Sequence, residues 1–133
     1  MNYGIEFETG QANAFISKLF HARIQTHIFH LQVQGEGSYA AHKALDDFYN
    51  GIVDITDELV EAYQGKYGII YDYALAPMDN FKSTKDCVAY LEGLHSYIDE
   101  KKSIIFKDSD LLNIIDEAKS LIKSTLYKMK FLE

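Results

Sequence analysis

The stretch HLQVQGEGSYAAH, residues 30–42, places a turn between two long helical patterns and thereby sets the fold of the first half of the chain. Gly35 and Gly37 lie at its centre, and glycine disfavours a continuous helix because it loses more backbone freedom on folding than any other residue. His30 and His42 lie at its two ends, equidistant from the centre. If the flanking helices pack antiparallel about the turn, equidistant residues lie side by side. We therefore expect the two imidazoles to be neighbours.

Apolar residues recur at three- and four-residue steps on both sides of this turn, which indicates amphipathic helices. The first helix is predicted over residues 12–33. The second is predicted over residues 39–63, with Ser38 as its N-cap and its end near Gly65. The short link between them favours an antiparallel pair.

Two more helical patterns occupy the second half of the chain. One helix is predicted to begin after a cap at Ser83 or Thr84 and to fade around Lys102, and another to begin with Ser109 as its cap. The preceding connection, residues 65–80, is longer than a tight turn requires and leaves room for one short helix. A short first link and a long second link predict an all-α fold, a ferritin-like four-helix bundle with a long crossover connection between its second and third helices.

Composition favours a single globular domain over residues 1–133, because 47% of the residues are hydrophobic and 25% are charged. The formal net charge of −7 argues against DNA binding, since affinity for a phosphate backbone comes from clustered Lys and Arg. The one cysteine, Cys87, cannot form an internal disulfide, and no segment has the pattern of a signal peptide or a membrane span. These features predict a cytoplasmic protein with no membrane association.

Potential metal ligands share one face of the predicted second helix. At about 100° per residue, Asp46 lies roughly 40°, Asp57 roughly 60° and Glu61 roughly 100° around the helix from His42. At 1.5 Å per residue, however, Asp57 is about 22 Å along the axis from His42. One metal ion therefore cannot contact both residues within a single chain.

The spacing instead predicts two half-sites in each chain. His30, His42 and Asp46 form an imidazole-rich half, and Asp57 and Glu61 form a carboxylate half. A two-fold axis between antiparallel copies of the second helix would bring the carboxylate half of one chain against the imidazole half of the other. Each homodimer would then hold two sites of mixed nitrogen and oxygen donors, which suit iron, with manganese or zinc as alternatives.

The segment THIFHLQVQGEGSYAAHKALDDFYNGIVDITDELVE, residues 26–61, resembles the Dps family, the mini-ferritins. In that family a His near the end of the first helix is followed by a Gly-containing turn, a second His and an Asp-x-x-x-Glu on the second helix. The spacing from His30 through His42 to Asp57 and Glu61 matches this pattern. The resemblance implies that these four residues are ferroxidase ligands shared across a dimer, with one further carboxylate contributed by Asp46.

The resemblance also implies a function. Fe(II) would bind between subunits and be oxidised by hydrogen peroxide or dioxygen, and Fe(III) would be stored as mineral in a hollow shell, commonly of twelve subunits built from two-fold dimers. The chain departs from the family in having Leu31 where a Trp usually follows the first ligand His, with Tyr39 or Tyr49 as possible substitutes. It is also short and has no basic N-terminal tail, so DNA binding is not expected. The alternative is a ferritin-like structural or assembly protein that binds a stabilising metal, such as zinc, without turnover.

Other titratable residues have less specific patterns. His27, three residues before His30, is expected to be an accessory ligand or a hydrogen-bonding partner of the site, and His21 is expected to be structural or exposed. Glu92 and His95 form a Glu-x-x-His pair, the spacing that di-iron bundles use within one subunit. Such a site needs a second Glu-x-x-His, which the chain lacks, so a solvated pair is expected instead.

Overall fold

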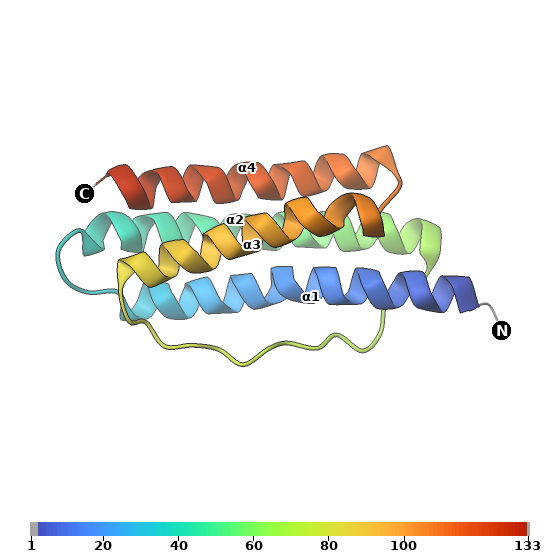
Figure 1. The fold of residues 1–133 in the computed structure, drawn as a ribbon, viewed down its shortest axis with the longest axis horizontal. Helices are drawn as coiled ribbons and strands as arrows, with labels where there is room; N and C mark the ends of the chain where they lie inside the picture. Colours follow the sequence, from blue (N-terminus) through green and yellow to red (C-terminus); the bar gives the residue numbers. More distant parts are fainter. Residues whose placement is uncertain (1–2, 133) are drawn as a thin grey trace.

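The computed structural model describes residues 3–132, with side chains from residue 10 onward. Its helices are α1 (Tyr3–Gln32), α2 (Ser38–Tyr67), α3 (Thr84–Ile105) and α4 (Ser109–Phe131), and the described residues include no strand (Figure 1). The predicted all-α four-helix bundle is therefore confirmed. No helix within the described part of the chain is both long enough and apolar enough to cross a membrane.

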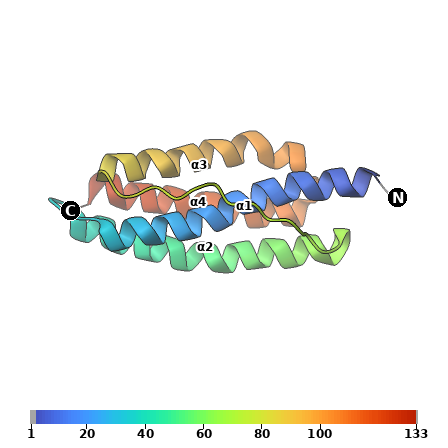
Figure 2. The same cartoon turned by 90° about the horizontal axis from the view of Figure 1, so that it is seen from below.

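Each helix packs mainly against two neighbours, α1 and α4 each lying against both α2 and α3. Helices α1 and α2 run antiparallel, as do α3 and α4, whereas α2 and α3 run in the same direction (Figures 1 and 2). This arrangement is possible because the connection between α2 and α3 returns along the length of the bundle beside α1.

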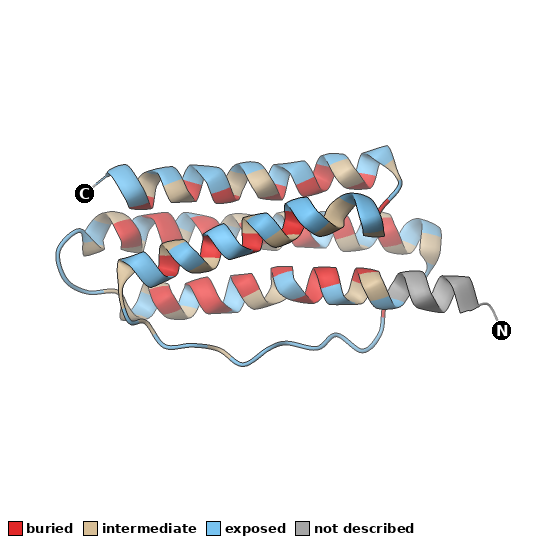
Figure 3. Ribbon diagram, viewed as in Figure 1, coloured by how far each residue is buried: buried red, intermediate tan, exposed pale blue. Residues whose placement is uncertain are grey.

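The core lies along the axis of the bundle, where the buried faces of the four helices meet (Figure 3). Burying one such large apolar side chain stabilises the fold by about 1.5–3 kcal/mol, so the predicted apolar stripes account for the main driving force. The largest fully buried side chains are Phe15, Phe48, Ile16, Leu19, Leu45, Ile52, Leu59, Leu91, Ile98, Leu111, Ile115 and Ile122.

The turn between α1 and α2 depends on glycine. Gly35 and Gly37 have φ angles of 98° and 75°, in the left-handed region that L side chains rarely adopt. The N-cap of α2 is Gly37, so no side-chain hydrogen bond caps this helix. Ser38 is the first helical residue, and the predicted Ser38 cap is therefore wrong. Instead, the Ser38 backbone N–H donates to the Gly35 carbonyl at 3.1 Å, because the tight turn brings these groups together.

The far end of α2 is held by α4. The helix continues past Gly65 to Tyr67, further than predicted, and the Tyr67 hydroxyl and the Lys66 ammonium donate to the Asp108 carboxylate at 2.5 Å and 2.6 Å. Lys66 and then Tyr67 lower the pKa of Asp108 by stabilising its charged form. Asp108 is the N-cap of α4 in place of the predicted Ser109, and it makes no side-chain cap bond.

The connection over residues 68–83 is extended and contains no helix. It is held by a polar stripe on α1, of which Gln25 is the centre. The buried Gln25 side-chain amide donates to the Asp79 carbonyl at 2.8 Å and accepts from the Asp79 N–H at 2.7 Å. Ser83 ends the connection by capping α3, as predicted, with its hydroxyl accepting from the Asp86 N–H. The other α1 side chains that bond to the connection are Asn13, Ser17, His21 and Gln32.

Candidate metal site

The two histidines at the ends of the α1–α2 turn lie against each other. The ring centroids of His30 and His42 are 3.8 Å apart, and the rings are tilted by only 22°. Nδ1 of His30 lies 2.8 Å from the His42 carbonyl oxygen, and Nδ1 of His42 lies 2.9 Å from the His30 carbonyl oxygen. The predicted adjacency of the two imidazoles is confirmed.

This reciprocal pairing fixes the tautomer of both rings. A carbonyl oxygen only accepts, so each Nδ1 must carry the proton and donate it. In a neutral imidazole the other nitrogen, Nε2, then holds a lone pair. Neither Nε2 atom of His30 or His42 has a hydrogen-bond partner within the described residues. The two stacked rings can therefore offer one nitrogen donor each.

The local fold explains why the pairing forms. His30 lies in the last turn of α1, where carbonyl groups have no donor within the helix. The His42 ring supplies the missing donor to the His30 carbonyl, because the glycine turn brings the start of α2 back beside the end of α1. The histidine pair therefore also closes the turn.

Asp46 lies one turn after His42 on α2 and is half-buried. Its carboxylate accepts a hydrogen bond from the Asn50 side-chain amide at 3.3 Å. It also bonds to the hydroxyl of Tyr49, and this hydrogen bond raises the pKa of the Tyr49 phenol. Asp46 therefore favours the protonated form of this phenol.

Tyr49 also contacts the histidines on α1. Its ring stacks on His27 with centroids 4.1 Å apart and lies edge-on to His30 at 5.3 Å. The centroids of His27 and His30 are 6.1 Å apart. We call His27, His30, His42, Asp46 and Tyr49 the histidine cluster. The contacts of Tyr49 with these histidines were not predicted. The sequence did indicate that Tyr49 shares a helix face with His42, because it follows His42 by seven residues, which is two helical turns.

Asp57 and Glu61 lie apart from the histidine cluster, further along α2. Both side chains are exposed, and neither forms a hydrogen bond or ion pair within the described residues. Within the part of the chain that the structure describes, no group of three or more His, Cys, Asp or Glu side chains is placed to hold a metal ion. The single chain thus brings His30 and His42 together and leaves the two carboxylates separate.

Apolar side chains are exposed on the same helices. Leu31 and Tyr39, on either side of the turn, are 70% and 73% exposed, and Ile24, one turn before His27, is 39% exposed. A contiguous exposed apolar patch is typical of protein contact surfaces. These three residues lie close in sequence to members of the histidine cluster, on α1 and α2.

The Glu-x-x-His pair on α3 has other partners. Glu92 is exposed and accepts a bond from the Lys130 ammonium at 2.8 Å, and Nδ1 of His95 lies 3.5 Å from Asp99. Neither residue joins a group of three potential ligands among the described side chains. A surface ion pair accounts for Glu92, whereas Nε2 of His95 is buried without a hydrogen-bond partner among the described residues.

Both ring nitrogens of His21 are hydrogen-bonded within the fold, and Cys87 is buried. Nε2 of His21 donates to the Pro77 carbonyl at 3.1 Å, and its Nδ1 therefore accepts from the Tyr90 hydroxyl at 2.7 Å, which confirms the structural prediction for His21. Burial raises the pKa of the Cys87 thiol to about 12. The thiol is thus protonated at neutral pH and unreactive.

A family model matches residues 30–129, a range that contains the histidine pair and the carboxylates Asp46, Asp57 and Glu61. No curated protein and no solved structure matches the chain. The match covers most of the chain and all four helices in whole or in part. The chain belongs to the family of unknown function DUF5856.

Proposed function

We propose that this protein is a ferritin-like ferroxidase of the Dps type, which binds Fe(II) between two chains and oxidises it with hydrogen peroxide or dioxygen. The observation that carries the proposal is the reciprocal hydrogen bonding of His30 and His42. Metal-binding histidines commonly donate their second ring N–H to a carbonyl or carboxylate, which fixes the tautomer and aims the other nitrogen at the metal. Both rings of the pair meet this condition.

The fold supports the proposal. Helices α2 and α3 run in the same direction and are joined by a long connection along the bundle, which is the topology of ferritin-like proteins with one crossover. Metal sites in such bundles are built from His and carboxylate side chains on facing helices. A Dps-type site differs in that the facing helices come from two chains.

The second chain would supply the carboxylates. A two-fold axis between antiparallel copies of α2 would place Asp57 and Glu61 of one chain beside His30 and His42 of the other, about 22 Å along the helix. Two equivalent sites would form in each dimer. The exposed apolar side chains around the histidine cluster would be buried in the same contact, which adds a hydrophobic contribution.

The ligands suit the chemistry. Fe(II) is the substrate, and carboxylates stabilise the additional positive charge of Fe(III) more than they stabilise Fe(II). Hydrogen peroxide accepts two electrons, one from each of two Fe(II) ions, and its O–O bond breaks to give two hydroxide ions. The net charge of −7 favours the approach of cations to the protein. Stored Fe(III) mineral in a closed shell of two-fold dimers would be the end product.

The direct test is oxidation of Fe(II) by the purified protein. Anaerobic protein loaded with Fe(II) and mixed with peroxide should show the Fe(III) absorbance well above a protein-free control, with two Fe(II) consumed per peroxide. Mass photometry should show particles that are multiples of a dimer of the 15.2 kDa chain. Oxidation no faster than the control contradicts the proposal. Binding of Zn(II) or Fe(II) without oxidation would instead support a structural metal-binding protein.

A substitution at Tyr49 tests whether this residue positions the Asp46 carboxylate for metal binding. Tyr49→Phe removes the Tyr49 hydroxyl and leaves Asn50 as the remaining partner of the Asp46 carboxylate, so we expect the apparent affinity for Fe(II) to fall by about tenfold, as is typical for residues that orient metal ligands. The maximal rate at saturating Fe(II) should change less. The matched control is Tyr127→Phe, since Tyr127 is exposed on α4 and makes no hydrogen bond among the described residues. Equal Fe(II) titrations for the two variants would exclude the positioning role.

A further inference from the structure

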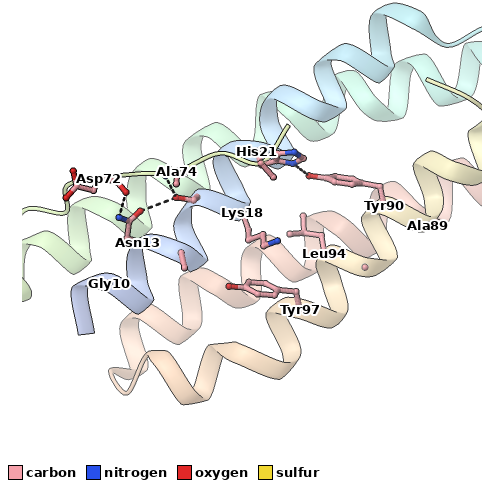
Figure 4. Close-up of a pocket in the computed structure, with 14 residues that line it drawn as sticks. Gly10, Asn13, Lys18, His21, Asp72, Ala74, Ala89, Tyr90, Leu94 and Tyr97 are labelled. Atoms are coloured by element: carbon pink, nitrogen blue, oxygen red, sulfur yellow. Dashed lines mark hydrogen bonds between the residues drawn. The ribbon is translucent and has the colours of Figure 1, made fainter. Parts of the chain in front are cut away.

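A pocket of about 570 Å³ lies between α1, the extended connection and α3 (Figure 4). This volume falls within the range of about 300–1,000 Å³ that is typical of small-molecule sites. The pocket exists because small residues from all three segments line it, namely Ala14, Ala74, Ala76, Ala89 and Gly93. A Cβ atom added at Gly93 would meet no atom within 4 Å, so this position opens onto free space.

The pocket contains a cation that has no acidic partner. The Lys18 side chain extends between Tyr97 and Leu94 (Figure 4), and its ammonium lies 5.3 Å from the centroid of the Tyr97 ring. Lys18 forms no ion pair within the described part of the chain, and the hydroxyl of Tyr97 has no hydrogen-bond partner there. Two donors are thus available at this pocket, the ammonium of the exposed Lys18 and the hydroxyl of the half-buried Tyr97.

The other polar groups in the pocket wall, apart from the Asp72 carboxylate, already have hydrogen-bond partners. His21 bonds to Tyr90 and to the connection, and the Asn13 amide donates to the carbonyls of Tyr71 and Asp72. Asp72 is the one acidic residue among those that line the pocket, and Figure 4 places it at the end beyond Asn13. The chemistry left to a ligand is therefore one positive charge and one hydroxyl between apolar walls, with the exposed Asp72 carboxylate at the far end.

We propose that this pocket binds a small organic carboxylate with an apolar body, its carboxylate bonded to Lys18 and Tyr97 and its body against the small side chains. The site is independent of the proposed ferroxidase site. His27 lies roughly 180° around α1 from Lys18, so the histidine cluster and the pocket occupy opposite faces of that helix. Loss of either activity would not remove the other.

The test is titration calorimetry of the full chain with decanoate, and with decan-1-ol as a probe of the same chain length without charge. We expect one decanoate to bind per chain, and decanol to bind about tenfold more weakly, because it lacks the charge-assisted bond. Lys18→Met should weaken decanoate about tenfold and leave decanol unchanged. Lys85→Met is the matched control, since Lys85 is an exposed lysine on α3 outside the pocket.

The second test uses a variant in which a larger side chain fills the pocket. Gly93→Leu should abolish binding of decanoate, whereas Gly65→Leu should not, because Gly65 also faces open space on a helix but lies outside the pocket. Thermal melts would show that both variants fold. No binding of decanoate by wild type, equal binding by Gly93→Leu and Gly65→Leu, or equal affinity of wild type for decanoate and decanol would overturn the proposal.

Discussion

His42→Ala is expected to lower the rate of Fe(II) oxidation by at least about 100-fold, because it removes one of the two nitrogen donors of the proposed site. Asp57→Ala is expected to do the same, although Asp57 lies about 22 Å along α2 from His42. Stopped-flow absorbance of Fe(III) after addition of peroxide measures both rates. The matched control for the carboxylate is Asp54→Ala, since Asp54 is also exposed on α2 and should leave the rate unchanged.

Mixed assemblies of the two inactive chains test whether the site is shared. In a dimer of one His42→Ala chain and one Asp57→Ala chain, one site carries both substitutions and the other carries neither. Random mixing gives such dimers half of the time, so co-expression should restore about a quarter of the wild-type activity. Recovery of no activity would show that the ligands act within one chain or not at all. Because His42 also bonds to the His30 carbonyl, melting curves must accompany the rates.

Gln25→Leu is expected to lower the free energy of unfolding by about 2–3 kcal/mol, because it leaves both backbone groups of Asp79 without their partner. Leucine keeps a similar volume, so the loss reports the hydrogen bonds rather than a cavity. Urea unfolding monitored by circular dichroism measures the change. In Gln34→Leu, the control, an exposed glutamine of the α1–α2 turn is replaced, and its stability should stay within about 0.5 kcal/mol of wild type.

In Gln25→Leu we expect the connection between α2 and α3 to open more often than the rest of the bundle. Hydrogen exchange of the backbone over residues 70–82 should accelerate in Gln25→Leu, while exchange in the centre of α4 stays slow. Uniform acceleration across the bundle would contradict a local role for Gln25 and indicate a general loss of core packing.

The sequence predicted the four helices and the long second link because apolar residues at three- and four-residue steps report directly on which helix face is buried. The adjacency of His30 and His42 was also predictable, since it follows from the position of the glycine turn alone. The separation of Asp57 from the histidines followed in the same way from the rise of a helix. These features depend on distance along one element or one turn.

Features that depend on contacts between distant segments were not predictable. Ser38 and Ser109 are good capping residues by type, but the left-handed Gly37 and the Asp108 contacts with α2 determine the observed helix starts. The polar residues of α1 gave no sign that they bind an extended connection more than 40 residues away. The pocket beside Lys18 likewise arises from small residues on three separate segments.

Each of the two histidine rings donates a hydrogen bond to the backbone carbonyl of the other histidine, and this arrangement has a thermodynamic consequence. Immobilising a side chain on binding costs about 0.5–1.5 kcal/mol of rotational entropy. In this protein that loss has already occurred for both rings when the helical hairpin forms. An ion bound at these rings would meet donors that need no reordering, and its net binding free energy would stabilise the closed hairpin.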